Sequence, residues 1–120
     1  MTVEQLALRD AINAGEHGVL IAPMDPARAR MNVGIRTLLD GASMTITVRD
    51  KSGFTIQSSQ RSYPPTYFVQ LPLAELVDNA VVLGDEVIVI AVDAGSAIVY
   101  GATTDNITQD PSVQIARPLQ

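Results

Sequence analysis

The sequence predicts an all-β domain: a two-sheet antiparallel β-sandwich, immunoglobulin-like or jelly-roll-like, with one short helix. Apolar residues make up 47% of the chain but include only two Phe and three Tyr, and a core rich in β-branched side chains favours pleated sheets. Turn-forming residues recur at short intervals, and several segments between them alternate apolar and polar residues. A length of 120 residues corresponds to one domain with one core.

The first fourteen residues allow two interpretations. Thr2 and Gln5 stand at the spacing of a capping box, in which the two side chains bind free N–H groups at a helix start, so a helix over 3–13 fits. Leu6 and Leu8 alternate with their neighbours, which suits an edge strand equally well. We therefore expect a helix or an edge strand over 1–14 and the β-sandwich over 15–120.

Three strands are expected next, at 17–23, 30–39 and 43–49. The first is an apolar run, and the third alternates apolar residues with Thr and Arg, as expected of a strand with one buried face. The second strand, at 30–39, would place four residues on one face, namely Met31, Val33, Ile35 and Thr37. Between the second and third strands, Asp40-Gly41 predicts a hairpin turn, because glycine accepts positive φ.

The middle of the chain predicts a hairpin, a strand break and a short helix. A turn at 50–53 leads into a strand at 54–62. Pro64-Pro65 ends that strand, because proline cannot donate a hydrogen bond to a sheet, and a new strand starts at 67–71. Residues 72–77 begin with proline and read as a short helical turn.

The last third of the chain predicts a central strand at 86–94, a turn at Ala94-Gly95, and strands at 96–103 and 113–116. The first of these is apolar on both faces, so we expect it to be covered on both sides. The residues expected to be largely buried are Met44, Ile46, Val48, Val87, Val89, Val99 and Tyr100.

The charge pattern narrows the possible partners. The net charge is −5, whereas nucleic-acid binding needs a basic face. Six of the eight basic residues lie between positions 28 and 61, and seven of the thirteen acids lie between 75 and 110, which would suit complementary patches between copies. No apolar stretch is long enough for a membrane helix. The chain has no cysteine, so redox chemistry does not indicate a compartment.

One loop contains residues that could bind a metal. Asp105, Asn106, Thr108 and Asp110 offer oxygen ligands of the kind calcium takes, but their spacing is not that of an EF-hand. The alternative, which we favour, is a turn closed by Asx-type side-chain hydrogen bonds.

Other short motifs are present. Asn106-Ile107-Thr108 is a formal glycosylation sequon, and the segment 64–67 matches a PPxY ligand for WW domains. His17 is the sole histidine, and no serine lies in a nucleophile-elbow context.

Several segments resemble, in order, a poorly characterised β-sandwich module of exported bacterial proteins. They are an N-x-G-x-x-x-L strand at Asn32–Leu38, a hairpin of T-V-x-x-D-x-x-G type near 45–50, and a closing Y-x-[SA]-x-x-D-N-x-T-x-D-P segment at Tyr100–Pro111. The resemblance runs from Gly15 onward. It implies a surface or extracellular structural, adhesive or accessory role and carries no catalytic residue.

We therefore expect a non-enzymatic structural, adhesive or accessory module without a cofactor. The resemblance implies that its parent protein is exported or at the cell surface, and a cytoplasmic location remains open. The expected partners are proteins, through self-association or neighbouring domains, rather than nucleic acid or membrane. The alternative is a calcium- or carbohydrate-dependent ligand-binding domain. Sugar sites usually present exposed aromatic rings, and this chain has no Trp and three Tyr.

Overall fold

The computed structural model describes residues 11–23, 28–77, 84, 86–109 and 111–118. These residues form one antiparallel sheet of seven strands and a short helix, which confirms the predicted all-β class. The elements in chain order are β1 (Ile12–Asn13), β2 (His17–Ile21), β3 (Ala29–Arg49), β4 (Thr55–Tyr63), β5 (Phe68–Pro72), α2 (Leu73–Leu76), β6 (Val87–Asp105) and β7 (Pro111–Ile115).

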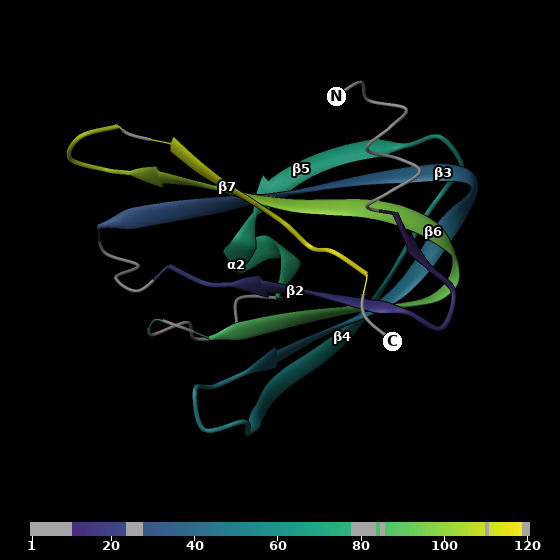
Figure 1. Cartoon of the computed structure of the whole chain (residues 1–120), viewed down its shortest axis with the longest axis horizontal. Coiled ribbons are helices and arrows are strands. Elements are labelled where there is room, and N and C mark those ends of the chain that lie inside the picture. Colours follow the sequence, from purple (N-terminus) through teal and green to yellow (C-terminus); the bar gives the residue numbers. More distant parts are fainter. Residues whose placement is uncertain (1–10, 24–27, 78–83, 85, 110, 119–120) are drawn as a thin grey trace.

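Two long strands, β3 and β6, connect two layers. They pair from Ala29 opposite Asp105 to Arg49 opposite Val87, and both bend in the middle (Figure 1). The upper layer in Figure 1 contains β5, the first half of β3, the second half of β6, and β7 with β1. The lower layer contains β2, the first half of β6, the second half of β3, and β4. The sandwich is therefore made of two halves of one folded sheet.

The bend replaces two turns that the sequence predicts. Strand β3 continues through Asp40-Gly41 and β6 continues through Ala94-Gly95, so the prediction of chain reversals at these sites is wrong. Residues 38–41 stand opposite the single residue Ser96, which is a large bulge that lets both strands change layer. Gly41 and Gly95 have φ values of 68° and 79°, a conformation that glycine adopts without strain.

The core fills the space between the layers. Four of the predicted core residues are buried, namely Met44, Ile46, Val48 and Val99. Val87, Val89 and Tyr100 are only partly buried, because residues 88, 90 and 92 of β6 face the core instead. The expectation of a strand covered on both sides is thus wrong. Because residues 87–92 are all apolar, the sequence does not show which of the two faces of the strand points inward.

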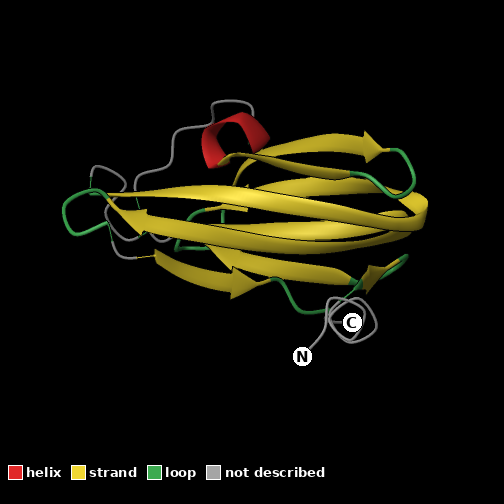
Figure 2. Ribbon diagram, turned by 90° about the horizontal axis from the view of Figure 1, so that it is seen from above, coloured by secondary structure: helices red, strands yellow, loops and turns green. Residues whose placement is uncertain are grey.

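The helix α2 closes the side of the sandwich between β4 and β5. Leu73 and Leu76 are buried, and the helix lies between the layers in Figure 1 and beside the long strands in Figure 2. Arg61 of β4 donates from Nη2 to the carbonyls of Glu75 at 2.7 Å and Leu76 at 3.2 Å, at the C-terminal end of the helix, where carbonyl groups are free to accept further hydrogen bonds. Among the described residues, no helix is long and apolar enough to span a membrane.

The N-terminal segment enters the upper layer as β1. Ile12 is fully buried, and the Ser96 hydroxyl donates a hydrogen bond to Asn13 Oδ1 at 2.7 Å. Residues 1–10, on which most of the helix-or-strand question falls, lie outside the described residues.

Candidate functional site

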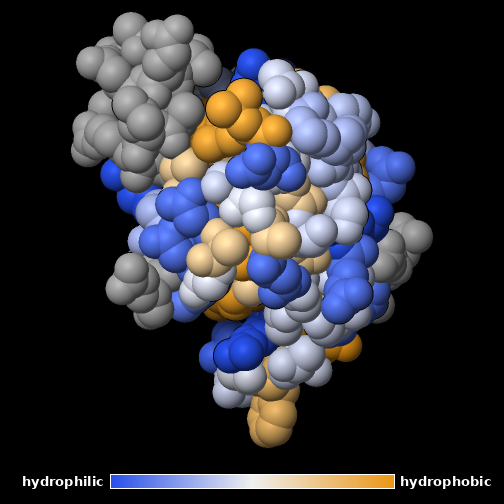
Figure 3. Space-filling model, turned by 90° about the vertical axis from the view of Figure 1, so that its right-hand side faces the viewer, coloured by the Kyte–Doolittle hydropathy of each residue, from blue (hydrophilic) through white to orange (hydrophobic). Residues whose placement is uncertain are grey.

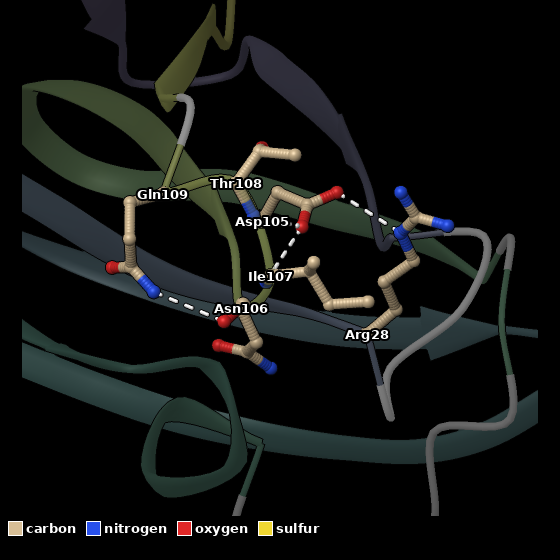
Figure 4. Close-up of polar contacts among 6 residues, drawn as sticks. All are labelled: Arg28, Asp105, Asn106, Ile107, Thr108 and Gln109. Carbon is tan, nitrogen blue, oxygen red and sulfur yellow. Dashed lines mark hydrogen bonds and ion pairs between the residues drawn. The ribbon is translucent and has the colours of Figure 1, made fainter.

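The turn between β6 and β7 contains the residues that the sequence offers as metal ligands. Asp105 Oδ1 accepts hydrogen bonds from the backbone N–H of Ile107 at 2.8 Å and of Thr108 at 3.0 Å (Figure 4). Gln109 adds a hydrogen bond from its side-chain amide to the Asn106 carbonyl at 3.0 Å. This is an Asx-type turn, in which the carboxylate takes the place of a backbone acceptor.

Two arginines bind the same turn, Arg28 directly before β3 and Arg30 near its start. Arg28 Nε donates to Asp105 Oδ2 at 3.1 Å, and Arg30 Nη1 donates to Asn106 Oδ1 at 2.6 Å. The backbone N–H groups of Thr108 and Ile107, together with Arg28, hold the pKa of Asp105 below its ordinary value, because they favour the charged form. Both carboxylate oxygens of Asp105 therefore already accept hydrogen bonds.

An open depression of about 430 Å³ lies beside this turn, with Arg28, Asp105, Thr108 and Ser112 in its lining. Asp110, the fourth suggested ligand, lies outside the described residues. Within the described ranges, no group of three or more His, Asp and Glu side chains is placed to hold a metal ion. The geometry of this site is that of a closed turn beside a shallow surface depression.

The other sequence motifs are part of the fold. The PPxY segment connects β4 to β5, and its Tyr67 ring stacks on Tyr63 with centroids 5.8 Å apart. The Tyr67 N–H donates to the buried Thr37 hydroxyl oxygen at 2.9 Å, so this segment packs against the bend. His17 lies in β2 opposite Ala91.

The structure also brings together an aromatic pair that the sequence analysis missed. Phe68 of β5 and Tyr100 of β6 have ring centroids 6.5 Å apart and planes 15° from parallel. Strand β3 passes between their strands, and Gly34 lies directly opposite Tyr100. A Cβ atom at Gly34 would overlap the Tyr100 ring, so this ring lies across the β3 backbone. Tyr100 Oη donates to Gln70 Oε1 at 3.2 Å.

This pair belongs to a wider surface, the outer side of the upper layer, which we call the ring face. Its residues alternate along each strand with residues that face the core. They are Arg30, Asn32, Gly34 and Arg36 of β3, Phe68, Gln70 and Pro72 of β5, Ile98, Tyr100, Ala102 and Thr104 of β6, and Pro111, Val113 and Ile115 of β7. None of these residues is acidic, although the chain has a net charge of −5. The ring face is therefore a cationic, aromatic surface on an acidic protein.

Other exposed apolar side chains lie apart from this surface. Leu39 at the bend is 85% exposed, and Phe54 at the hairpin between β3 and β4 is 73% exposed. Figure 3 views the molecule from the end at which β3 and β6 bend, where a largely hydrophilic surface surrounds separate hydrophobic patches. Single exposed apolar residues are normal in folded domains. The pair of Phe68 and Tyr100 differs from them, because the two rings stack and the Tyr100 ring packs directly on the backbone of Gly34.

Comparison with known proteins adds information on the fold alone. No protein-family model matches the sequence, and no curated protein matches it. The fold is similar to that of a Thermotoga maritima protein, known from the crystal structure of Thermotoga maritima 1070, with a TM-score of 0.61. The match covers 90% of this chain and 96% of that chain at 11% sequence identity. The β-sandwich architecture is thus shared with a solved structure of very different sequence.

Proposed function

We propose that the chain is a non-enzymatic β-sandwich binding module with an adhesive or accessory role, and that it contacts its ligand through the ring face. The observation that carries this proposal is the fitted pair of Phe68 and Tyr100. Phe68 is 47% exposed, and the Tyr100 ring is held over Gly34. Rings that are already fixed in place lose little conformational entropy when a ligand covers them.

The form of the ring face supports binding rather than catalysis. It is the side-chain surface of four neighbouring strands, β5, β3, β6 and β7. Small-molecule and catalytic sites are typically concave and enclose most of the ligand, whereas a sheet surface contacts an extended ligand along one side. An exported or cell-surface location remains part of the proposal on the strength of the sequence resemblance.

The ring pair favours a carbohydrate as the ligand, so the second candidate function is that of a carbohydrate-binding domain. The face of an aromatic ring carries partial negative charge and attracts the polarised C–H groups of a sugar ring. Gln70 accepts a hydrogen bond from Tyr100, and Asn32 lies two residues before Gly34 on the same face of β3. Both side-chain amides can donate to and accept from hydroxyl groups. Arg36 lies opposite Phe68, and its guanidinium can bind a carboxylate with two hydrogen bonds. The preferred ligand is therefore an acidic polysaccharide.

Affinity gel electrophoresis tests this function. The gels contain polygalacturonate as the acidic probe or hydroxyethylcellulose as the neutral probe, and a single-stranded DNA oligonucleotide is tested in parallel because bases also stack on aromatic rings. We expect retardation by polygalacturonate that is lost in Phe68→Ala and Arg36→Ala. Phe54→Ala removes a phenylalanine that lies outside the ring face and is more exposed than Phe68, and this variant should bind like the parent. Stronger binding to DNA, equal retardation of all variants, or no retardation would contradict the proposal.

A further inference from the structure

Strand β4 is a long sheet edge. It is hydrogen-bonded to β3 on one side, and no described strand pairs with its other side. It forms the lower border of the molecule in Figure 1. Such an edge presents unpaired N–H and C=O groups that readily pair with another strand.

The other described edge strands carry features that discourage pairing. Strands β5 and β7 have five residues each and include Pro72 and Pro111. Strand β2 also has five residues, and the Gln114 amide both donates to the Ile21 carbonyl at 2.8 Å and accepts from its N–H at 2.9 Å. Strand β4 has nine residues and no proline. Short length, proline and covered backbone groups are the usual protections of an edge, and among the described residues none of these protects β4.

The side chains of β4 also present no charge barrier to a second copy. Its exposed residues include Thr55, Ser58 and Gln60, which are uncharged. Its one charged residue, Arg61, points toward α2 and binds the helix carbonyls there. An edge charge is a further common protection against pairing, and it is missing here.

We propose that β4 pairs with β4 of a second copy of this chain, antiparallel about a two-fold axis, so that the two lower layers form one continuous sheet. A two-fold interface must be self-complementary. An axis through Ser58 places Arg61 opposite Thr55 of the second copy, and an axis through Ser59 places it opposite Gln57. In either register the two Arg61 residues do not lie opposite each other, so like charges do not prevent β4 from pairing with β4 of a second copy.

The proposed dimer presents two ring faces on one side. The two-fold axis is perpendicular to the lower layer, because antiparallel strands in one sheet keep the same face. The two upper layers then lie on the same side of the continuous lower sheet, and their ring faces point in the same direction. A repeating ligand such as a polysaccharide could contact both ring faces, which raises the overall affinity without any new contact. The dimer itself does not depend on the proposed ligand.

The edge, rather than the charge blocks of the sequence, carries this proposal. Arg28 and Asp105 belong to the basic and acidic blocks, and they form an ion pair within one chain. Strand β3, which contains three of the six basic residues, and β6, which contains two of the seven acids, are neighbours in the sheet. Copies with a net charge of −5 repel each other, and salt screens this repulsion. We therefore expect the dimer to persist or strengthen as the salt concentration rises.

Sedimentation velocity from low to high micromolar concentration tests the proposal. The edge variant is Ser58→Lys combined with Gln60→Lys. The matched control is Thr47→Lys combined with Thr45→Lys, because these residues lie directly opposite Ser58 and Gln60 on the central strand β3. We expect the parent and the control to dimerise and the edge variant to remain a monomer. A monomeric parent at every concentration, or equal dimerisation of the parent and edge variant, would overturn the proposal.

Hydrogen exchange on the unmodified chain gives a readout that does not depend on how the variants fold. Amides of β4 that point away from β3 should gain protection as the protein concentration rises, while the amides of β5 and β7 should not change. A concentration-dependent gain confined to another surface would place the interface elsewhere and overturn the assignment to β4.

Discussion

The Tyr100 ring occupies the space that a side chain at position 34 would fill, so Gly34 and Tyr100 are fitted to each other across the upper layer. This relationship fixes the ring across the β3 backbone and beside Phe68. The geometry of the ring face therefore depends on the absence of a Cβ atom at one position in the middle of a strand.

Replacing Gly34 by alanine should displace the Tyr100 ring. We expect a loss of about 1–3 kcal/mol in the free energy of unfolding, the usual cost of overpacking, together with a changed near-UV circular dichroism signal. In a Tyr100→Ala background the same replacement should cost much less, because the ring is no longer there. A urea double-mutant cycle measures this coupling, and an equal cost in both backgrounds would show that the two residues are not fitted to each other.

Replacing Gly95 by alanine should disturb the bend between the layers. The residue has φ of 79°, and its Cβ would overlap the Gly41 carbonyl. Gly53 is the matched control, because it has φ of 90° and no atom within 4 Å of a Cβ. We expect Gly53→Ala to cost about 1–3 kcal/mol for the backbone strain alone and Gly95→Ala to cost more. Equal costs in urea denaturation would argue against a close approach at the bend.

The Asp105 turn should make stability depend on pH. The pKa of Asp105 is lowered from its ordinary value of 3.8, so its contribution is fully present above that value and is lost as the pH falls through the lowered folded-state pKa. Asp105→Asn should therefore be less stable than the parent at neutral pH, and the difference should shrink at acid pH. Thermal melts of both proteins over this range measure it. A difference that stays constant to pH about 2 would contradict the assignment.

Calcium should not raise the melting temperature, because the carboxylate oxygens of Asp105 already accept hydrogen bonds within the chain. A bound ion at 100 times its dissociation constant would add about 2.7 kcal/mol, which a melting curve detects easily. A calcium-dependent rise that disappears in both Asp105→Ala and Asp110→Ala would show that the loop is a metal site.

The strands with a regular alternation are the part of the fold that the sequence predicts best. Residues 43–49 show a period of two, and they form the second half of β3 with Met44, Ile46 and Val48 buried. The hairpin at 50–53 is also as predicted, because Gly53 has positive φ and Asp50 accepts hydrogen bonds from the Ser52 and Phe54 amides. The sequence does not distinguish the bends at Gly41 and Gly95 from hairpin turns, because a glycine with positive φ occurs in both.

The ring face could not be predicted because it depends on strand order. Phe68 and Tyr100 are far apart in sequence, and they meet only because β5 and β6 flank the first half of β3. The one local indication was Gly34, since an isolated glycine within a strand pattern suggests a close backbone approach. Its partner could be any aromatic residue until the strand order is known.

Chemical-shift mapping tests directly whether ligands bind at the ring face. The ¹⁵N-labelled chain is titrated with a galacturonic acid oligosaccharide, and backbone amide shifts are followed by two-dimensional NMR. We expect the largest changes at Gly34, Arg36, Phe68 and Tyr100, with β2 and β4 unaffected apart from any effect of dimerisation in the free protein. Changes confined to the 105–109 turn or to the lower layer, or no changes at millimolar oligosaccharide, would contradict the account.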